Sequence, residues 1–176
     1  MEPKAVSESS AILPHWMGII DANNAGNIHG GVIMKLADEV AGLAAVKYSR
    51  HQVVTVGMDR MDFRVPIYVG ELVTFQAMVN AAWRTSMEVG VRVQAENPLE
   101  GTVRHTNTAY LTMVALDANG RPSPVPPPLA TSAVEQRRLR EAELRRANRL
   151  AERAEILEHR QRDVARQPPQ AETDQN

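Results

Sequence analysis

The chain has 176 residues, a hydrophobic share of 43% and a formal net charge of -1. This is enough for one domain with an apolar core and an extension, and it provides no global field to attract nucleic acid or a membrane surface. The chain has no cysteine, which excludes disulfides, thiolate nucleophiles and cysteine metal sites. The five histidines lack metal-ligand spacing, so we expect no metal. The first 20 residues do not resemble a signal peptide and no apolar run could span a bilayer, so we expect a cytoplasmic protein.

The N-terminal half is predicted to contain a long helix after an irregular start. Residues 1–10 are polar, and we expect them to be flexible. Residues 11–17 could form a first strand, which Pro14 would confine to an edge of the sheet. A polar, glycine-bearing turn at residues 21–29 then leads into a predicted helix over residues 30–48. The apolar positions of that helix recur at the spacing of one buried stripe, namely Ile33, Leu36, Ala37, Val40, Leu43 and Ala44.

Four strands are predicted after this helix, because apolar and polar residues alternate and turn signals separate the segments. The predicted strands cover residues 53–63, 72–81, 87–95 and 104–116. One long helix followed by four antiparallel strands can bury its apolar stripe only by lying across the sheet. We therefore predict a single two-layer α+β domain over residues 11–128.

The C-terminal region, residues 129–166, is predicted to be a proline-rich linker followed by a charged helix. Ser132 and Glu135 have the spacing of a capping box. Residues 135–166 contain ten arginines and seven acidic residues, which interleave and leave no basic face. We favour a solvated helix with charge pairs over a coiled coil or a nucleic-acid arm. Residues 167–176 are expected to be disordered.

The turn at residues 21–29 and the helix that follows it carry the main candidates for chemistry. Gly30 and Gly31 would let a ligand approach the free N–H groups of the helix start, which suit a carbonyl oxygen or a phosphate. Asp38 lies two turns further on, on the same side as Met34 and Ala41. Partial desolvation there would raise its basicity, although the usual position of an aspartate on a helix is exposed.

These segments resemble the hotdog-fold acyl-CoA thioesterases, in particular the cytosolic and brain acyl-CoA hydrolases. The resemblance is clearest in residues 21–39. Together with the other matching segments, which follow in the same order, it covers about residues 12–128. The other matching segments are residues 53–56, 62–63, 69–71, 84–89 and 108–111.

The resemblance implies roles for individual residues. It makes Asp38 the general base or nucleophile and Asn23 the active-site asparagine, whose amide could donate to a thioester oxygen and accept from a water. It points the Gly31 N–H, next to Gly30, at the developing oxyanion. The remaining implied contacts are with coenzyme A, by the loop residue His29, by Val54 and Thr55 beside the pantetheine arm, and by the turn residues Arg84, Thr85 and Ser86.

The function that the resemblance implies is hydrolysis of fatty acyl-CoA to a free acid and coenzyme A. No cofactor is expected, because coenzyme A is part of the substrate. An apolar tunnel lined by Met34, Ala41 and Met58 could take the acyl chain. Asn23 and Asp38 of one site would come from different protomers, so we expect a dimer or a trimer of dimers. Two alternatives stay open: a non-catalytic acyl-CoA-binding protein, and a structural or regulatory oligomer that meets a partner through its arginine-rich helix.

Overall fold

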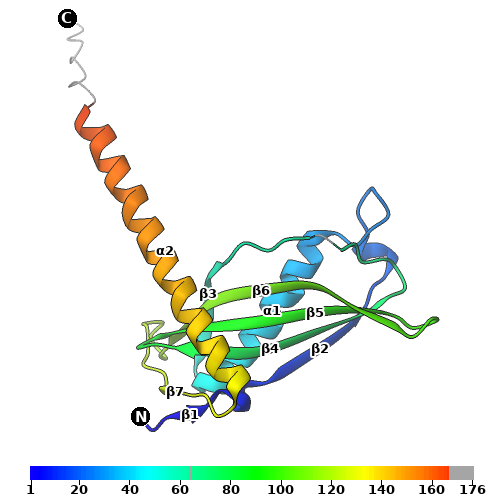
Figure 1. Ribbon diagram of the computed structural model, residues 1–176, viewed down its shortest axis with the longest axis horizontal. Helices are drawn as coiled ribbons and strands as arrows, with labels where there is room; N and C mark the ends of the chain where they lie inside the picture. The colour runs from blue at the N-terminus through cyan, green and yellow to red at the C-terminus, as the bar shows by residue number, and fades with distance from the viewer. Residues whose placement is uncertain (64, 167–176) are drawn as a thin grey trace, which may run out of the picture. The chain divides into compact units, whose positions relative to one another are not determined.

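The computed structural model describes residues 1–63 and 65–166 of the chain. Two compact units are distinguished, Met1–Leu139 and Arg140–Asn176, and each is described by itself. In the first unit, a curled antiparallel sheet wraps helix α1, Gly30–Ser49 (Figure 1). The predicted α+β hotdog architecture is therefore confirmed. The five strands of the sheet are β2 (Ala11–Trp16), β3 (Gln52–Met58), β4 (Leu72–Ala82), β5 (Ser86–Asn97) and β6 (Thr102–Leu116).

The order of the strands is β2-β4-β5-β6-β3, and every neighbouring pair is antiparallel. Strand β2, which contains Pro14, lies at an edge of the sheet. This is the position that Pro14 requires, because proline has no N–H to donate to a second neighbouring strand. The other edge is β3, whose Val54 and Val56 are exposed. Residues on the inner face of the sheet pack against α1, and β4 and β5 supply most of this core, for example Phe75, Val79 and Val91.

Helix α1 begins and ends close to the predicted bounds. His29 is its N-cap, and Arg50 ends it with a left-handed φ of 60° while donating its N–H to Val46 O at 2.8 Å. The predicted apolar stripe is buried except for Leu43, which is 50% exposed and lies on the side of the helix away from the sheet. Ala41 and Ala45 are buried in addition, so the contact face of α1 is wider and made of smaller residues than expected.

The N-terminal segment, expected to be flexible, has regular structure. β1 (Lys4–Ala5) pairs in parallel with β7 (Pro128–Leu129), and η1 (Val6–Ser9) packs beneath the sheet. The Val6 side chain is buried, and the Ser9 hydroxyl accepts a hydrogen bond from the Val79 N–H at 2.8 Å. A single apolar residue and a buried hydroxyl thus anchor a segment whose polar composition gave no such signal.

Helix α2 (Ala133–Arg166) starts with the predicted capping box. The Glu135 carboxylate accepts from the N–H groups of Thr131 and Ser132 at 2.8 and 2.9 Å, and the Ser132 hydroxyl accepts from the Glu135 N–H at 3.2 Å. These backbone hydrogen bonds hold the pKa of Glu135 below its usual value. Further along, residues 151–162 are exposed, and Arg162 pairs with Glu158 at 2.6 Å. The tail predicted to be disordered lies outside the described residues.

Candidate active site

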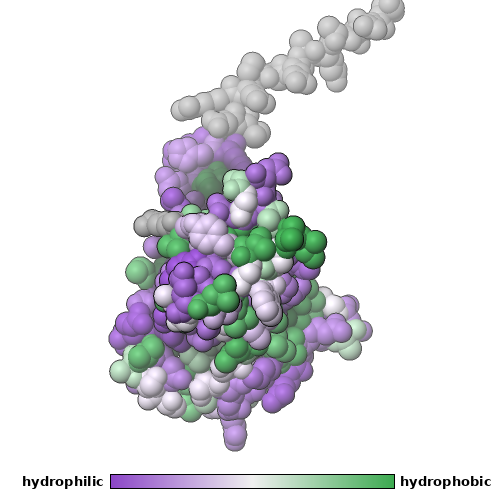
Figure 2. Space-filling model, turned by 90° about the vertical axis from the view of Figure 1, so that its right-hand side faces the viewer, coloured by the Kyte–Doolittle hydropathy of each residue, from purple (hydrophilic) through white to green (hydrophobic). Residues whose placement is uncertain are grey.

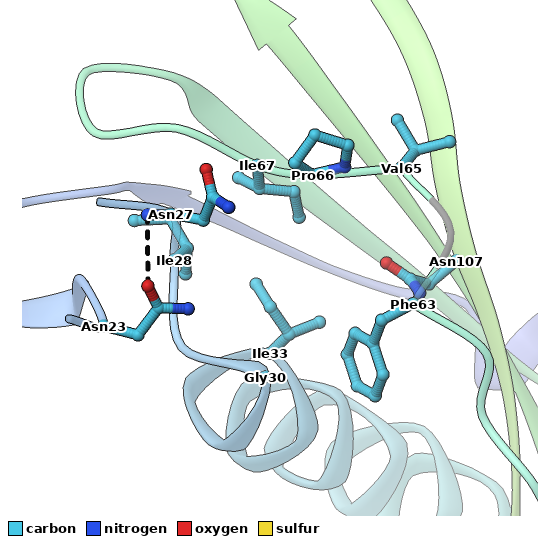
Figure 3. A pocket seen from close by; sticks show the side chains of 10 residues that line it. All are labelled: Asn23, Asn27, Ile28, Gly30, Ile33, Phe63, Val65, Pro66, Ile67 and Asn107. Carbon is cyan, nitrogen blue, oxygen red and sulfur yellow. Dashed lines mark hydrogen bonds between the residues drawn. The ribbon is translucent and has the colours of Figure 1, made fainter. Parts of the chain in front are cut away.

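The loop that carries Asn23 is held by the side chain of Asn23 itself. Its Oδ1 accepts hydrogen bonds from the N–H groups of Ala25, at 2.9 Å, and Asn27, at 3.2 Å. Both lone pairs of that oxygen are used within the loop. The Nδ2 group points the other way, into a cavity (Figure 3). Asn23 is therefore placed as a donor, and its own loop fixes its orientation.

Gly30 and Gly31, at the start of α1, have different roles. The Gly31 N–H donates to Nδ1 of His29 at 2.9 Å, which caps the helix. This hydrogen bond occupies the N–H that the sequence analysis assigned to the oxyanion. Gly30 instead lines the cavity beside Asn23, and the Phe63 ring lies where a Cβ on Gly30 would make ordinary contact, at 3.5 Å. The exposed ring of His29 orders the start of the helix in this arrangement.

The cavity has a volume of about 240 Å³ and lies between the start of α1, the inner face of β6 and the loop that joins β3 to β4. Its described lining is mostly apolar, with three amide side chains and no charged group. The lining residues are Asn23, Asn27, Ile28, Gly30, Ile33, Phe63, Val65, Pro66, Ile67 and Asn107 (Figure 3). The tunnel expected along Met34, Ala41 and Met58 is not this cavity, since none of the three lines it and Ala41 is buried in the core.

An ion pair holds the loop that forms one wall of the cavity. The Arg104 guanidinium donates to both carboxylate oxygens of Glu71, at 2.6 and 2.7 Å, and to Pro66 O at 2.9 Å. Burial alone would raise the pKa of Glu71, but the hydrogen bonds from Arg104 and the Tyr68 N–H, with the charge of Arg104, outweigh it and lower the pKa. The predicted strand 53–63 ends at Met58 because the chain leaves the sheet there to form this wall.

Asp38 lies away from the cavity, about 12 Å further along α1 from Gly30 at the helical rise of 1.5 Å per residue. It is half-buried, and its Oδ1 accepts a hydrogen bond from the Thr55 hydroxyl at 2.6 Å. Thr55 belongs to the edge strand β3 and is itself exposed. The resemblance to the thioesterases implied a position for Thr55 beside the pantetheine arm. The structure makes it the direct partner of the candidate base.

The turn between β4 and β5 holds Arg84 and Thr85, as predicted, and Ser86 begins β5, but this turn lies at the other end of α1. The Val125 N–H donates to Arg84 O at 3.1 Å, and the neighbouring residue Pro126 accepts from the Tyr48 hydroxyl near the end of the helix. A helix of 20 residues is about 30 Å long. Within one chain, this turn and Val54 on the edge strand are thus not brought together with Asn23.

Asn107 is a candidate that the sequence analysis missed. It lies on β6 at the same parity as the buried residues Ala109 and Leu111, so it points toward α1 and the cavity. A β-bulge between its pairing with Val93 and the next pair lets it and Thr106 both be buried. The available signal was a polar residue at a core-facing position of an alternating strand.

Within the described residues, the geometry supports neither a metal site nor a membrane-spanning helix. In the described part of the chain, no three His, Asp or Glu side chains converge in a way that could hold a metal ion. Likewise, none of the helices within residues 1–63 and 65–166 combines the length and apolar character that crossing a bilayer requires.

Comparisons with known proteins agree with this architecture. Residues 25–115 match the family model described as the thioesterase superfamily. The chain is 34% identical over 142 residues to the cytosolic acyl coenzyme A thioester hydrolase of Mus musculus, a match that covers 80% of this chain and 37% of that longer protein.

Solved structures give the same result. An apo-hexameric acyl-CoA thioesterase is 36% identical with a TM-score of 0.84, covering 88% of this chain and 99% of that one. The acyl-CoA hydrolase of Staphylococcus aureus, solved with butyryl coenzyme A and coenzyme A, is 32% identical with a TM-score of 0.82, covering 92% and 98%. Single alanine variants of that hydrolase were also solved, at an asparagine, an aspartate fifteen residues later and a threonine seventeen residues after the aspartate. The chain belongs to the thioesterase superfamily, among the hotdog acyl-CoA thioester hydrolases.

Proposed function

We propose that this protein hydrolyses fatty acyl-CoA to the free acid and coenzyme A. The acyl carbonyl oxygen is held at the start of α1 by two donors, the Nδ2 group of Asn23 and the N–H of Gly30. These donors are fixed before the substrate arrives, Asn23 by its loop and Gly30 by the helix. Donors in place before the reaction stabilise the charge that develops on the carbonyl oxygen without reorganisation.

Asp38 supplies the base in this mechanism. Its carboxylate takes a proton from a water, whose oxygen attacks the carbonyl carbon; the C–S bond then breaks and the leaving sulfur of coenzyme A takes up the proton. Direct attack by Asp38 to form an anhydride, which water then hydrolyses, uses the same residues. The Thr55 hydroxyl holds the carboxylate in one orientation through its 2.6 Å hydrogen bond.

The observation that carries the proposal is the arrangement of Asn23 and Asp38 within one chain. Asn23 faces the cavity, whereas Asp38 faces the edge strand through Thr55. A complete site therefore needs Asp38 from a second protomer. Support comes from the S. aureus hydrolase, because Asn23, Asp38 and Thr55 repeat the fifteen- and seventeen-residue spacings of its three varied residues.

The surface of the chain fits such an assembly. The β3 edge exposes Val54 and Val56, the latter at 59%, next to exposed apolar residues of α1 such as Met34. An apolar, unpaired strand edge is a site for pairing with another chain. Apolar residues are also exposed at the end of β2 and in the short helix after it, where Trp16 and Ile20 are 72% and 96% exposed. Figure 2 shows apolar side chains on the right-hand side of the view in Figure 1. Two such surfaces suit a dimer or a trimer of dimers.

A thiol-release assay with fatty acyl-CoA substrates tests the proposal. Replacing Asp38→Asn keeps the shape of the side chain and removes the base, so kcat should fall by roughly two to four orders of magnitude. Glu39→Gln is the matched control, because Glu39 is the next residue on α1, is exposed and pairs only across one helical turn with Lys35 at 3.6 Å. Near-normal turnover in Asp38→Asn would refute the assignment. Absence of thiol release in the wild type would favour a non-catalytic acyl-CoA-binding protein.

A further inference from the structure

The cavity contains a hydrogen-bond acceptor that no residue in the described part of the chain satisfies. Asn107 is 3% exposed, and its Nδ2 donates to the carbonyl oxygen of Asp62 at 2.6 Å. This contact fixes the orientation of the Asn107 amide. In the flipped orientation, Oδ1 would lie 2.6 Å from the carbonyl oxygen of Asp62, and two acceptor oxygens repel each other. Oδ1 then points into the cavity (Figure 3), and it is the one buried side-chain N or O atom without a partner among the residues that the structure describes. A buried acceptor of this kind needs a donor from outside the described residues, and a bound ligand can supply it.

The cavity suits the acyl chain of an acyl-CoA better than it suits the coenzyme A part. Its described walls carry no charge, and its volume is about 240 Å³. The described walls offer the phosphates of coenzyme A no charged partner, whereas they match an apolar acyl chain. With the carbonyl held by Asn23 and Gly30, the coenzyme arm leads outward and the first carbons of the acyl chain enter between the apolar walls. This step rests on the function proposed above.

An unsubstituted acyl chain has no group that could donate to Asn107. It would cover Oδ1 with apolar atoms and leave the acceptor buried without a hydrogen bond. A hydroxyl close to the thioester would satisfy it. Sites built to bind a substrate hydroxyl discriminate against the analogue that lacks it, because the buried polar group is then left unpaired.

We propose that Asn107 is a specificity-determining residue whose Oδ1 accepts a hydrogen bond from a hydroxyl on the acyl chain. The preferred substrates are thus short-chain acyl-CoAs that carry a hydroxyl within the first few carbons. The amide does this while its Nδ2 holds the carbonyl of Asp62, so the acceptor is aimed into the cavity by the same loop that forms the cavity wall.

The test compares kcat/KM for butyryl-CoA with kcat/KM for its 3-hydroxy and 4-hydroxy derivatives, by thiol release from the full-length protein. The wild type should prefer at least one hydroxylated substrate by about tenfold, the equivalent of one hydrogen bond. Asn107→Leu removes the acceptor and should abolish the preference. Asn107→Asp keeps an acceptor but loses the donor to Asp62, and it should retain the preference. Each variant is judged by the ratio of its own substrates, so a loss of folded enzyme cancels.

Each result decides the matter. Thiol release from all three substrates at equal rates would overturn the role of Asn107 and leave the hydrolase function standing. A wild-type preference that survives Asn107→Leu would place the hydroxyl elsewhere and also overturn the proposal. An equal fall for every substrate in Asn107→Leu would leave the ratio of the substrates unchanged and would count against the proposal in the same way. Release from none of the substrates would remove the hydrolase function itself.

Discussion

Replacing Glu71→Gln tests how the cavity wall is held in place. The Glu71 side chain is 8% exposed and receives two hydrogen bonds from Arg104, at 2.6 and 2.7 Å, and one from the Tyr68 N–H at 2.9 Å. Glutamine keeps the size of the side chain and one acceptor oxygen. It removes the negative charge and one of the two charge-assisted hydrogen bonds, and it leaves the Arg104 guanidinium without its counter-charge.

The expected cost follows from the partial burial of the pair. Breaking a fully buried ion pair costs about 3–5 kcal/mol, whereas an exposed pair contributes about 0–1 kcal/mol. Arg104 is 32% exposed, so an intermediate loss of about 2 kcal/mol in the free energy of unfolding is expected. For a chain of this size, that loss corresponds to a fall in Tm of roughly 4–8 °C. The loop 59–71 should loosen with it, and KM should rise because the loop forms one wall of the cavity.

The difference in Tm between the wild type and the Glu71→Gln variant should depend on pH. The pKa of Glu71 in the folded protein lies below its value in the unfolded chain. The contribution of Glu71 to the free energy of unfolding is therefore fully present above its pKa in the unfolded chain, which is about 4.3. This contribution is lost as pH falls through the pKa of Glu71 in the folded protein. Thermal unfolding of the wild type and Glu71→Gln, followed from pH 7 down to pH 3, should give a gap in Tm that narrows steadily below about pH 4.3.

Glu39→Gln serves as the control for this experiment, since its partner Lys35 is 75% exposed and the change should shift Tm little at any pH. A Glu71→Gln gap that stays constant down to pH 3 would show that packing, and not the ion pair, holds the loop. A gap no larger than that of Glu39→Gln would refute the reasoning altogether.

Substitutions at three further positions, Thr55, Gly30 and Gly31, test how the base is held and how the start of α1 is built. Thr55→Val removes the hydroxyl that bonds Asp38 and should lower kcat by about tenfold to a hundredfold, while Thr55→Ser should keep most of the rate; equal rates in both would contradict a positioning role. Gly30→Ala meets Phe63 at an ordinary 3.5 Å and should raise Tm slightly, because alanine favours the helix. Gly31→Ala meets Nδ1 of His29 at 3.0 Å and should lose that gain together with the cap, so identical Tm changes in the two variants would argue against the His29 cap.

The fold followed from the sequence because its signals are local. The 3.6-residue stripe of α1, the alternation in β4 to β6 and the Ser132–Glu135 capping box each depend on residues close in the chain, and Pro14 marked an edge strand. The resemblance supplied the candidates Asn23 and Asp38, which periodicity alone left no better than a turn former and an exposed acid.

The parts that sequence reasoning missed depend on contacts between distant segments. Asn107 anchors Asp62 across 45 positions, and Arg104 reaches Glu71 across 33. The loop between β3 and β4 has no periodicity of its own, so neither the end of β3 at Met58 nor the cavity wall could be predicted. The choice between Gly30 and Gly31 was set by the rotamer of one histidine ring, which no sequence pattern encodes.

The shared site can be tested most directly by subunit mixing. Asn23→Ala and Asp38→Ala chains would each be inactive alone, and thiol release would be measured after coexpression in equal amounts. If one site takes Asn23 from one protomer and Asp38 from its partner, half of the dimers would be mixed and each mixed dimer would regain one of its two sites, giving about a quarter of the wild-type rate. Coexpressed oligomers with no more activity than either variant alone would contradict a site built from two protomers.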